Sequence, residues 1–210
     1  MYNPAAFKIT DSASVEELVR RHSFATIVGI IDGVAHLAYA PTLFLPGGKC
    51  GRVQFHLASA NPLAEVQQGA RLTLSFLGPH TYISPRWYKT SGQVPTWNYV
   101  AVEAAGHVRR LRTDELKSQL DLLVTQNEAR LSGSEPWALS QLSNDRFEAL
   151  LKAIRGFEVE LESLEGKRKL SQNRAAEDAA GAIVGLETTG DSASLAVAQA
   201  MKEDWVGSNI

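Results

Sequence analysis

The chain contains a single cysteine, and this scarcity excludes two kinds of stabilising site. Cys50 cannot form an internal disulfide, and no second thiol is available to hold a zinc ion with it. We expect Cys50 to act as a small apolar side chain near a turn. The five histidines lack the HExxH spacing of zinc proteases, and neither a Gly-x-Ser-x-Gly elbow nor a phosphate loop ending in Lys-Ser/Thr occurs.

Long apolar runs are also absent. No stretch approaches the roughly 20 residues needed to cross a bilayer, and the first residues lack the basic start and apolar core of a signal peptide. We therefore expect no membrane partner and a cytoplasmic location. The net charge is -2, with 21 Lys and Arg against 23 Asp and Glu. This balance disfavours a broad basic surface for nucleic acid, but it allows a local basic patch.

Strands dominate the predicted structure of the first half. The apolar, β-branched run 24–31 ends at Asp32-Gly33, which predicts a strand that enters a tight hairpin. Residues 70–77 alternate apolar and polar side chains, as is typical of a half-buried strand. No strand–helix–strand rhythm occurs, so an antiparallel barrel is favoured over a Rossmann sheet. Further strands are predicted at 34–45, 52–57 and 97–111, with Gly106 as a candidate bulge.

Helical patterns lie mainly in the second half. Ser14 and Glu17 predict a capping box for an early helix over 11–21, and Asn61-Pro62 predicts the start of a short helix that Gly69 ends. We expect one α+β domain over 1–210. Within it, 113–155 is a helical insertion: one helix starts with Thr113 as a cap, and a second covers 147–154. A strand over 157–161 follows. The segment 175–205 holds two C-terminal helices, over 175–186 and 192–202.

Three segments are rich in aromatic, amide, hydroxyl and cationic side chains: 78–85, 94–99 and 164–174. Two of the four tryptophans and three of the five tyrosines lie between Tyr82 and Tyr99. Aromatic faces beside hydrogen-bonding groups suit a flat heteroaromatic ligand, and clustered cations suit a phosphate. The combination favours a phosphorylated ring cofactor, with FMN as the best candidate. Aromatic packing over the end of a barrel would explain the same rings without a ligand.

Two of these patterns have further interpretations. In 55–62 a strand leads into a capped helix start, where free backbone N–H groups can bind phosphate, although an ordinary connection has the same pattern. The basic run at 167–169 and Arg174 could serve a cofactor phosphate, a nucleic-acid phosphate or a solvated surface. Charge alone does not separate these uses.

Taken together, the motifs resemble those of the PaiB-type, FMN-binding negative transcriptional regulators, and the resemblance covers nearly the whole chain. It implies an antiparallel split β-barrel of the FMN-binding type, related to pyridoxamine-phosphate oxidase. It also implies a homodimer with FMN at the subunit interface, and a repressor for which DNA is a candidate partner. The matching segments are Met1-Tyr2, Phe24-Ala25-Thr26, His56-Leu57-Ala58-Ser59-Ala60-Asn61-Pro62, 78–88, 94–99, Gly156-Phe157-Glu158 and 164–174.

By this analogy the phosphate lies near His56, Ser59, Asn61 and Lys169, and the ring lies near the aromatic segment. We assign no catalytic residue and no metal ligand. The candidate cofactor-binding residues are His56, Ser59, Ala60, Asn61, His80, Tyr82, Ser84, Trp97, Asn98, Lys169, Ser171, Gln172 and Asn173.

Three positions depart from the family pattern. Ser59 stands where Arg is usual, Arg86 where a small residue is usual, and Tyr39 where His is usual before Ala40-Pro41. Loss of a cation at Ser59 would weaken phosphate binding, and Arg86 would either compensate for it or block the pocket.

Two other functions stay open beside the regulator. A flavin-dependent oxidoreductase would rely on the cofactor for its redox chemistry, with His80 and Tyr82 as the acids to test. A flavin-free relative would be an interaction module. No helix-turn-helix signature occurs, so any DNA contacts are expected from two copies of Lys167, Arg168, Lys169 and Arg174.

Overall fold

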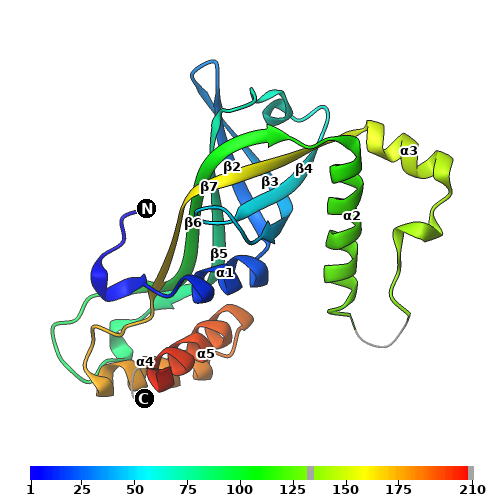
Figure 1. Cartoon of the computed structure of the whole chain (residues 1–210). Helices are drawn as coiled ribbons and strands as arrows, with labels where there is room; N and C mark the ends of the chain where they lie inside the picture. Colours follow the sequence, from blue (N-terminus) through cyan, green and yellow to red (C-terminus); the bar gives the residue numbers. More distant parts are fainter. Residues whose placement is uncertain (132–134, 208–210) are drawn as a thin grey trace. The chain divides into compact units, whose positions relative to one another are not determined.

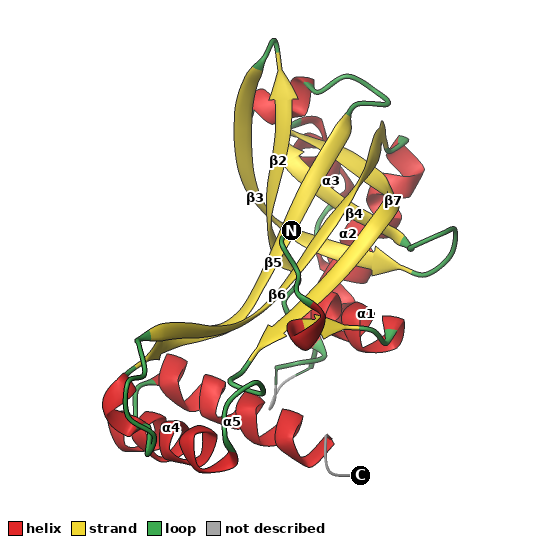
Figure 2. Ribbon diagram, turned by 90° about the vertical axis from the view of Figure 1, so that its left-hand side faces the viewer, coloured by secondary structure: helices red, strands yellow, loops and turns green. Residues whose placement is uncertain are grey.

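The computed structural model describes residues 1–131 and 135–207. Strands and helices alternate irregularly along the chain (Figures 1 and 2). In order, the elements are η1 (Ala5–Phe7), β1 (Lys8–Ile9), α1 (Ser12–Arg21), β2 (Phe24–Ile31), β3 (Val34–Leu45), β4 (Arg52–Ala58), η2 (Pro62–Glu65), β5 (Arg71–Ile83), η3 (Pro85–Trp87), β6 (Thr96–Arg110), α2 (Thr113–Glu128), η4 (Leu139–Gln141), α3 (Asn144–Lys152), β7 (Ile154–Lys169), α4 (Ala176–Thr189) and α5 (Ser192–Gly207).

The strands form one sheet in the order β1-β7-β4-β3-β2-β5-β6, and β6 also pairs with β7. Every pair with a defined register is antiparallel, from the β2–β3 hairpin, with Phe24 opposite Pro41, to the β4–β7 pair. Because the strand order returns to β7, the arrangement is that of a split barrel. The predicted α+β class, with peripheral helices and a helical C-terminal segment, is confirmed.

The chain divides into two compact units. The first comprises 1–18, 77–102 and the residues from 165 onward, and the second comprises 19–76 and 103–164. In the first unit, α4 and α5 pack against each other. The second unit buries an apolar core within the sheet. Phe55 and Phe157, which face each other in the β4–β7 register, stack there with ring centroids 5.3 Å apart.

A buried carboxylate organises the polar part of the second unit. Glu158 on β7 is 4% exposed and accepts hydrogen bonds from Gln54 Nε2 at 2.7 Å and Arg109 Nε at 3.0 Å. Arg109 also donates to both carboxylate oxygens of Glu115, each at 2.9 Å. Glu115 in turn accepts from the backbone N–H of Arg112 at 2.8 Å and so fixes the start of α2. One guanidinium therefore links β6, β7 and a helix start.

The Arg109 guanidinium and the Arg112 amide lower the pKa of Glu115 from 4.5 to about 2. A carboxylate whose pKa is lower in the folded state stabilises that state above its unfolded pKa. This contribution is lost as the pH falls from 4.5 toward 2.

The structure corrects two predicted helix starts. Asp11, not Ser14, caps α1, because its Oδ2 accepts from the backbone N–H and the hydroxyl of Ser14 at 2.8 and 2.7 Å. Arg112, not Thr113, is the N-cap of α2. In both cases the helix begins before the predicted cap has been passed, because α1 starts at Ser12 and α2 at Thr113 itself.

Four predicted boundaries were also wrong. Asn61 does cap a helix, with Oδ1 accepting from Leu63 N at 2.9 Å, but that helix is a 3₁₀ turn over Pro62–Glu65. Ile154 opens β7 instead of continuing α3. The strands β5 and β7 extend to Ile83 and Lys169, beyond the predicted ends at 77 and 161, so they include much of the segments 78–85 and 164–174.

Among the described helices, none is long and apolar enough to cross a bilayer. Among residues 1–131 and 135–207, no cluster of three His, Cys, Asp or Glu side chains could hold a metal ion.

Candidate functional site

Three of the predicted rings lie together in the first unit. The His80 and Trp97 rings stack with centroids 6.4 Å apart and an interplanar angle of 27°, and the edge of Tyr82 meets Trp97 at 6.5 Å. His80 and Tyr82 share a face because they are two residues apart on β5. Trp97 is 53% exposed and Tyr82 45%. We call His80, Tyr82 and Trp97 the aromatic platform. It leaves ring surface open to a planar ligand.

A cation borders this platform. Lys169 Nζ donates to Thr96 Oγ1 and, at 3.0 Å, to the carbonyl oxygen of Trp97. Burial lowers the pKa of Lys169, and the nearby charges of Lys167 and Arg174 act in the same direction. An ammonium has three N–H donors, so an anion could take the third and would offset the repulsion. The structure thus joins the second and third predicted segments at one place.

Other predicted residues have local structural roles. Asn98 is 1% exposed, and its Nδ2 donates to Ser171 Oγ at 2.9 Å. Ser84 Oγ caps η3 by accepting from Arg86 N at 3.3 Å. Gln172 bonds the backbone that precedes it: its Oε1 accepts from Leu170 N at 2.7 Å, and its Nε2 donates to Arg168 O at 2.6 Å. These side chains shape the surroundings of the platform. Asn173 is exposed.

The four remaining predicted residues belong to the second unit. His56 on β4 lies with Nδ1 3.3 Å from Oε1 of Gln119, and burial lowers the pKa of this histidine. A neutral imidazole has one N–H, which His56 uses on the Gln119 oxygen, so its Nε2 offers a phosphate neither a donor nor a charge. Ser59 is half-buried and Ala60 exposed, while the Asn61 oxygen is occupied as the cap of η2. The segment offers an accessible backbone at Ala60 but no cation.

The basic run does not form the continuous patch that the sequence suggested. Residues 167 and 169 share one face of β7, and Arg168 lies on the other. Lys167 is only 6% exposed, donates to the carbonyl of Tyr2 at 3.0 Å and lies 5.2 Å from the ring centroid of Tyr99. Arg174 bonds Gln93 and lies over the ring of Tyr88. Lys167 therefore presents little surface to a DNA phosphate, which disfavours the contact expected of it.

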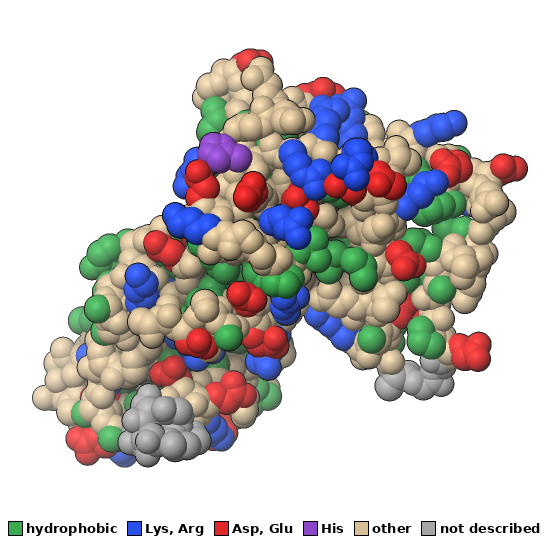
Figure 3. Space-filling view, in the orientation of Figure 1, with side chains coloured by type: hydrophobic (Ala, Val, Ile, Leu, Met, Phe, Trp, Pro, Cys, Tyr) green, Lys and Arg blue, Asp and Glu red, His purple; other side chains and the backbone are tan. Residues whose placement is uncertain are grey.

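Acidic side chains accompany the cations elsewhere. In the second unit, Arg155 and Arg110 both pair with Glu65, at 2.5 and 3.9 Å. The face in Figure 3 shows Lys and Arg side chains interspersed with Asp and Glu. On this face the charges mix instead of forming a basic surface.

Sequence reasoning missed two buried polar groups. Gln119 is fully buried on α2, and its Nε2 has no hydrogen-bond partner among the described residues. The sequence pattern that could have revealed its burial is its position: Gln119 lies at helical spacing between the apolar Leu116 and Leu123. Asp178 in the first turn of α4 is 1% exposed and binds Lys89 N and Thr90 N at 2.7 and 2.9 Å. Nothing in the sequence pairs Asp178 with that loop.

Comparison with known protein families assigns this chain to a family. The family model described as "Putative FMN-binding domain" matches residues 1–163. The chain belongs to this FMN-binding family. Over 204 residues it is 31% identical to "Protease synthase and sporulation protein PAI 2" of Bacillus subtilis (strain 168), covering 97% of each chain. The PaiB-type membership that the motifs predicted is confirmed, and FMN is the cofactor of the family.

Further relatives extend the family and the fold. An uncharacterised protein of Emericella nidulans is 32% identical over 183 residues, which is 73% of each chain. The FAD and heme binding protein of Mycobacterium smegmatis shares the fold with a TM-score of 0.55 at 15% identity, over 77% of this chain and 73% of that one. The flavocytochrome Anf3 of Azotobacter vinelandii has a TM-score of 0.51 at 17% identity, over 77% and 68%.

Proposed function

We propose that this protein binds FMN at the aromatic platform and acts as a regulator of the PaiB type. The observation that carries the cofactor proposal is the pairing of open ring surface with Lys169, whose ammonium bonds the carbonyl of Trp97 itself. A flavin needs a flat partner for its ring and a cation for its phosphate or its electron-rich ring edge. Both are present within one unit of the fold.

Replacing Trp97 with alanine is expected to raise the FMN dissociation constant about tenfold to a hundredfold. Stacking of a nucleotide-like ring on an aromatic side chain contributes about 1–3 kcal/mol. Lys169→Met should raise the constant about tenfold, because one charge-assisted hydrogen bond is lost. Quenching of flavin fluorescence during titration measures both.

Matched controls are Trp137→Ala and Lys49→Met. Trp137 is 38% exposed in the second unit, and Lys49 is exposed in the turn between β3 and β4. Neither should change FMN affinity. If Trp97→Ala and Trp137→Ala bound FMN with equal affinity, the aromatic platform would not be part of the flavin site.

The protein is also proposed to be a homodimer, and one sheet face supports this. In the β2–β3 register, Thr26 faces Tyr39 and Val28 faces Leu37, and these residues point outward together with Phe24, the first residue of β2. Phe24, Tyr39 and Leu37 are 66%, 64% and 56% exposed. An apolar sheet face of this kind marks a protein interface more often than a solvated surface.

A charge in this face should separate the subunits. Leu37→Glu is expected to shift the protein from dimer to monomer at micromolar concentration, because a carboxylate would have to be buried without a partner. Sedimentation velocity measures the shift, and Leu122→Glu, at a 47% exposed position on α2 rather than on this sheet face, serves as the control. A wild-type protein that sediments as a monomer would reject the homodimer.

The regulatory part of the proposal rests on the likeness over 97% of the chain to the PAI 2 protein. It predicts a set of transcripts that rise when the gene is deleted and fall again when the wild-type gene is restored. Transcript levels that are the same in all three strains would reject regulation while leaving FMN binding intact.

A further inference from the structure

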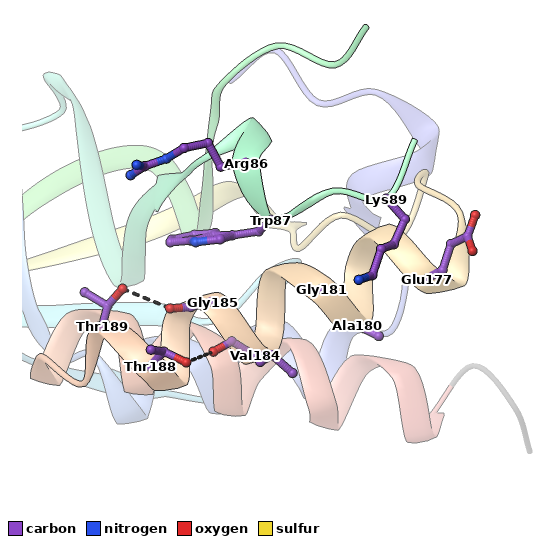
Figure 4. A pocket seen from close by; sticks show the side chains of 10 residues that line it. All are labelled: Arg86, Trp87, Lys89, Glu177, Ala180, Gly181, Val184, Gly185, Thr188 and Thr189. Carbon is purple, nitrogen blue, oxygen red and sulfur yellow. Dashed lines mark hydrogen bonds between the residues drawn. The ribbon is translucent and has the colours of Figure 1, made fainter. Parts of the chain in front are cut away.

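A hollow of about 710 Å³ lies in the first unit along one side of α4, separate from the aromatic platform in its lining residues. Its floor is the helix surface formed by small or apolar residues, among them Ala180, Gly181 and Val184. The indole of Trp87 lies across the helix beside this floor (Figure 4). The size lies within the range of pockets that hold small organic ligands.

The hollow is held open by contacts between η3 and α4. A Cβ on Gly181 would come within 2.1 Å of the carbonyl oxygen of Trp87, and a Cβ on Gly185 would come within 2.3 Å of its ring. The two glycines thus let the tryptophan lie directly on the helix. The loop after Trp87 is fastened by Asp178, whose Oδ1 accepts from Lys89 N and Thr90 N. The shape is therefore built before any ligand arrives.

Positive charge lies at both ends of the apolar floor. Arg86 extends above Trp87 at one end, and the ammonium of Lys89 points over the helix at the other (Figure 4). Arg86 Nε is held 3.4 Å from Ser84 Oγ, which orients the guanidinium, and no hydrogen bond from its terminal N–H groups occurs within the described residues. The lone carboxylate of the lining, Glu177, points away from the other labelled side chains. The hydroxyls of Thr188 and Thr189 are occupied by the helix carbonyls of Val184 and Gly185.

We propose that this hollow binds a small planar aromatic carboxylate, distinct from FMN. The ring would lie on the apolar floor beside Trp87, where aromatic contacts add to the burial of apolar area. The carboxylate would take the forked N–H groups of Arg86, the geometry that a guanidinium matches best. A neutral aromatic ligand would leave that charge unused, and an aliphatic anion would leave the indole uncovered.

The test uses 2-naphthoate and the neutral 2-naphthalenemethanol, titrated calorimetrically into the FMN-loaded full chain. We expect one naphthoate per chain, bound about tenfold more tightly than the alcohol. Arg86→Gln should lower naphthoate affinity about tenfold and leave the alcohol unchanged. Val184→Glu should abolish naphthoate binding, because it places a carboxylate on the floor; Val184 is 61% exposed, so the helix should tolerate it. Lys49→Gln is the charge control and should have no effect.

Several results would overturn the proposal. These are no binding of naphthoate at millimolar concentration, equal affinities for the two probes, or an Arg86→Gln variant that binds naphthoate normally. Displacement of naphthoate by excess FMN would assign the ligand to the flavin site instead. Binding that occurs only after dilution to monomers would mean that a second copy of the chain covers the groove. Since Arg86 is exposed, its variant remains informative if Val184→Glu fails to fold.

Discussion

Replacing Gly106 with alanine is expected to lower the free energy of unfolding by about 3 kcal/mol or more, the largest single loss that we predict. A Cβ at this position would lie 1.9 Å from the carbonyl oxygen of Glu160 and 2.7 Å from its carbonyl carbon. Both atoms belong to the backbone of β7, so relief requires the two strands to move apart. Overpacking against a rigid neighbour commonly costs 1–3 kcal/mol, and here no flexible side chain can yield. Urea denaturation followed by far-ultraviolet circular dichroism measures the loss.

Two glycine variants provide graded controls. Gly33→Ala sits in the β2–β3 turn at φ +78° with open space around it, so only left-handed backbone strain of about 1 kcal/mol applies. Gly29→Ala meets the ends of the Leu72 and Leu63 side chains at 2.6 and 2.7 Å, which can shift. It should fall between the other two. A Gly106→Ala protein as stable as Gly33→Ala would show that β6 and β7 do not approach so closely.

Removing the carboxylate of Glu158 is expected to cost about 2–3 kcal/mol. The Glu158→Ala change leaves Gln54 Nε2 without its partner and deprives Arg109 of one of its two carboxylates. Breaking a fully buried pair costs 3–5 kcal/mol. The Arg109 side chain is 37% exposed and keeps Glu115, so the lower figure applies. Thermal unfolding of the variant, combined with urea denaturation, measures the effect.

Neighbouring positions isolate the contribution of the charge. Glu158→Gln retains an acceptor for Gln54 or Arg109 and should recover part of the lost stability. Glu160→Ala lies two residues along the same strand at an exposed position and should change stability by less than about 0.5 kcal/mol. If Glu158→Ala and Glu160→Ala were equally stable, the network around Arg109 would contribute nothing.

Sequence patterns predicted the hairpin best. The strands 24–31 and 34–45 have the predicted bounds because an apolar run, a two-residue turn and a return run are all local signals. The β5 and β7 strands were drawn too short. The predicted strand 70–77 ends before Gly78 and Pro79, although pairing within the sheet keeps the chain extended to Ile83. Here contacts between strands far apart in the sequence outweigh local strand propensity, and a short stretch of sequence does not reveal such contacts.

The sequence predicted which types of residue form the candidate site, but it did not predict how they are arranged in space. Aromatic and cationic segments pointed to Trp97 and Lys169, which the structure brings into contact through the Trp97 carbonyl. Which cations face outward depends on the alternation of β7, and that register placed Lys167 in the interior. The residues of the hollow beside α4 come from η3 and a helix some ninety residues later. Their meeting follows from tertiary packing alone.

The most direct test of FMN binding is the visible spectrum of purified protein that has been mixed with excess FMN and freed of unbound flavin by gel filtration. The account predicts a yellow protein that retains about one flavin per chain, with absorption bands shifted from those of free FMN by the aromatic contact. A colourless protein, with all of the flavin eluting separately, would contradict it.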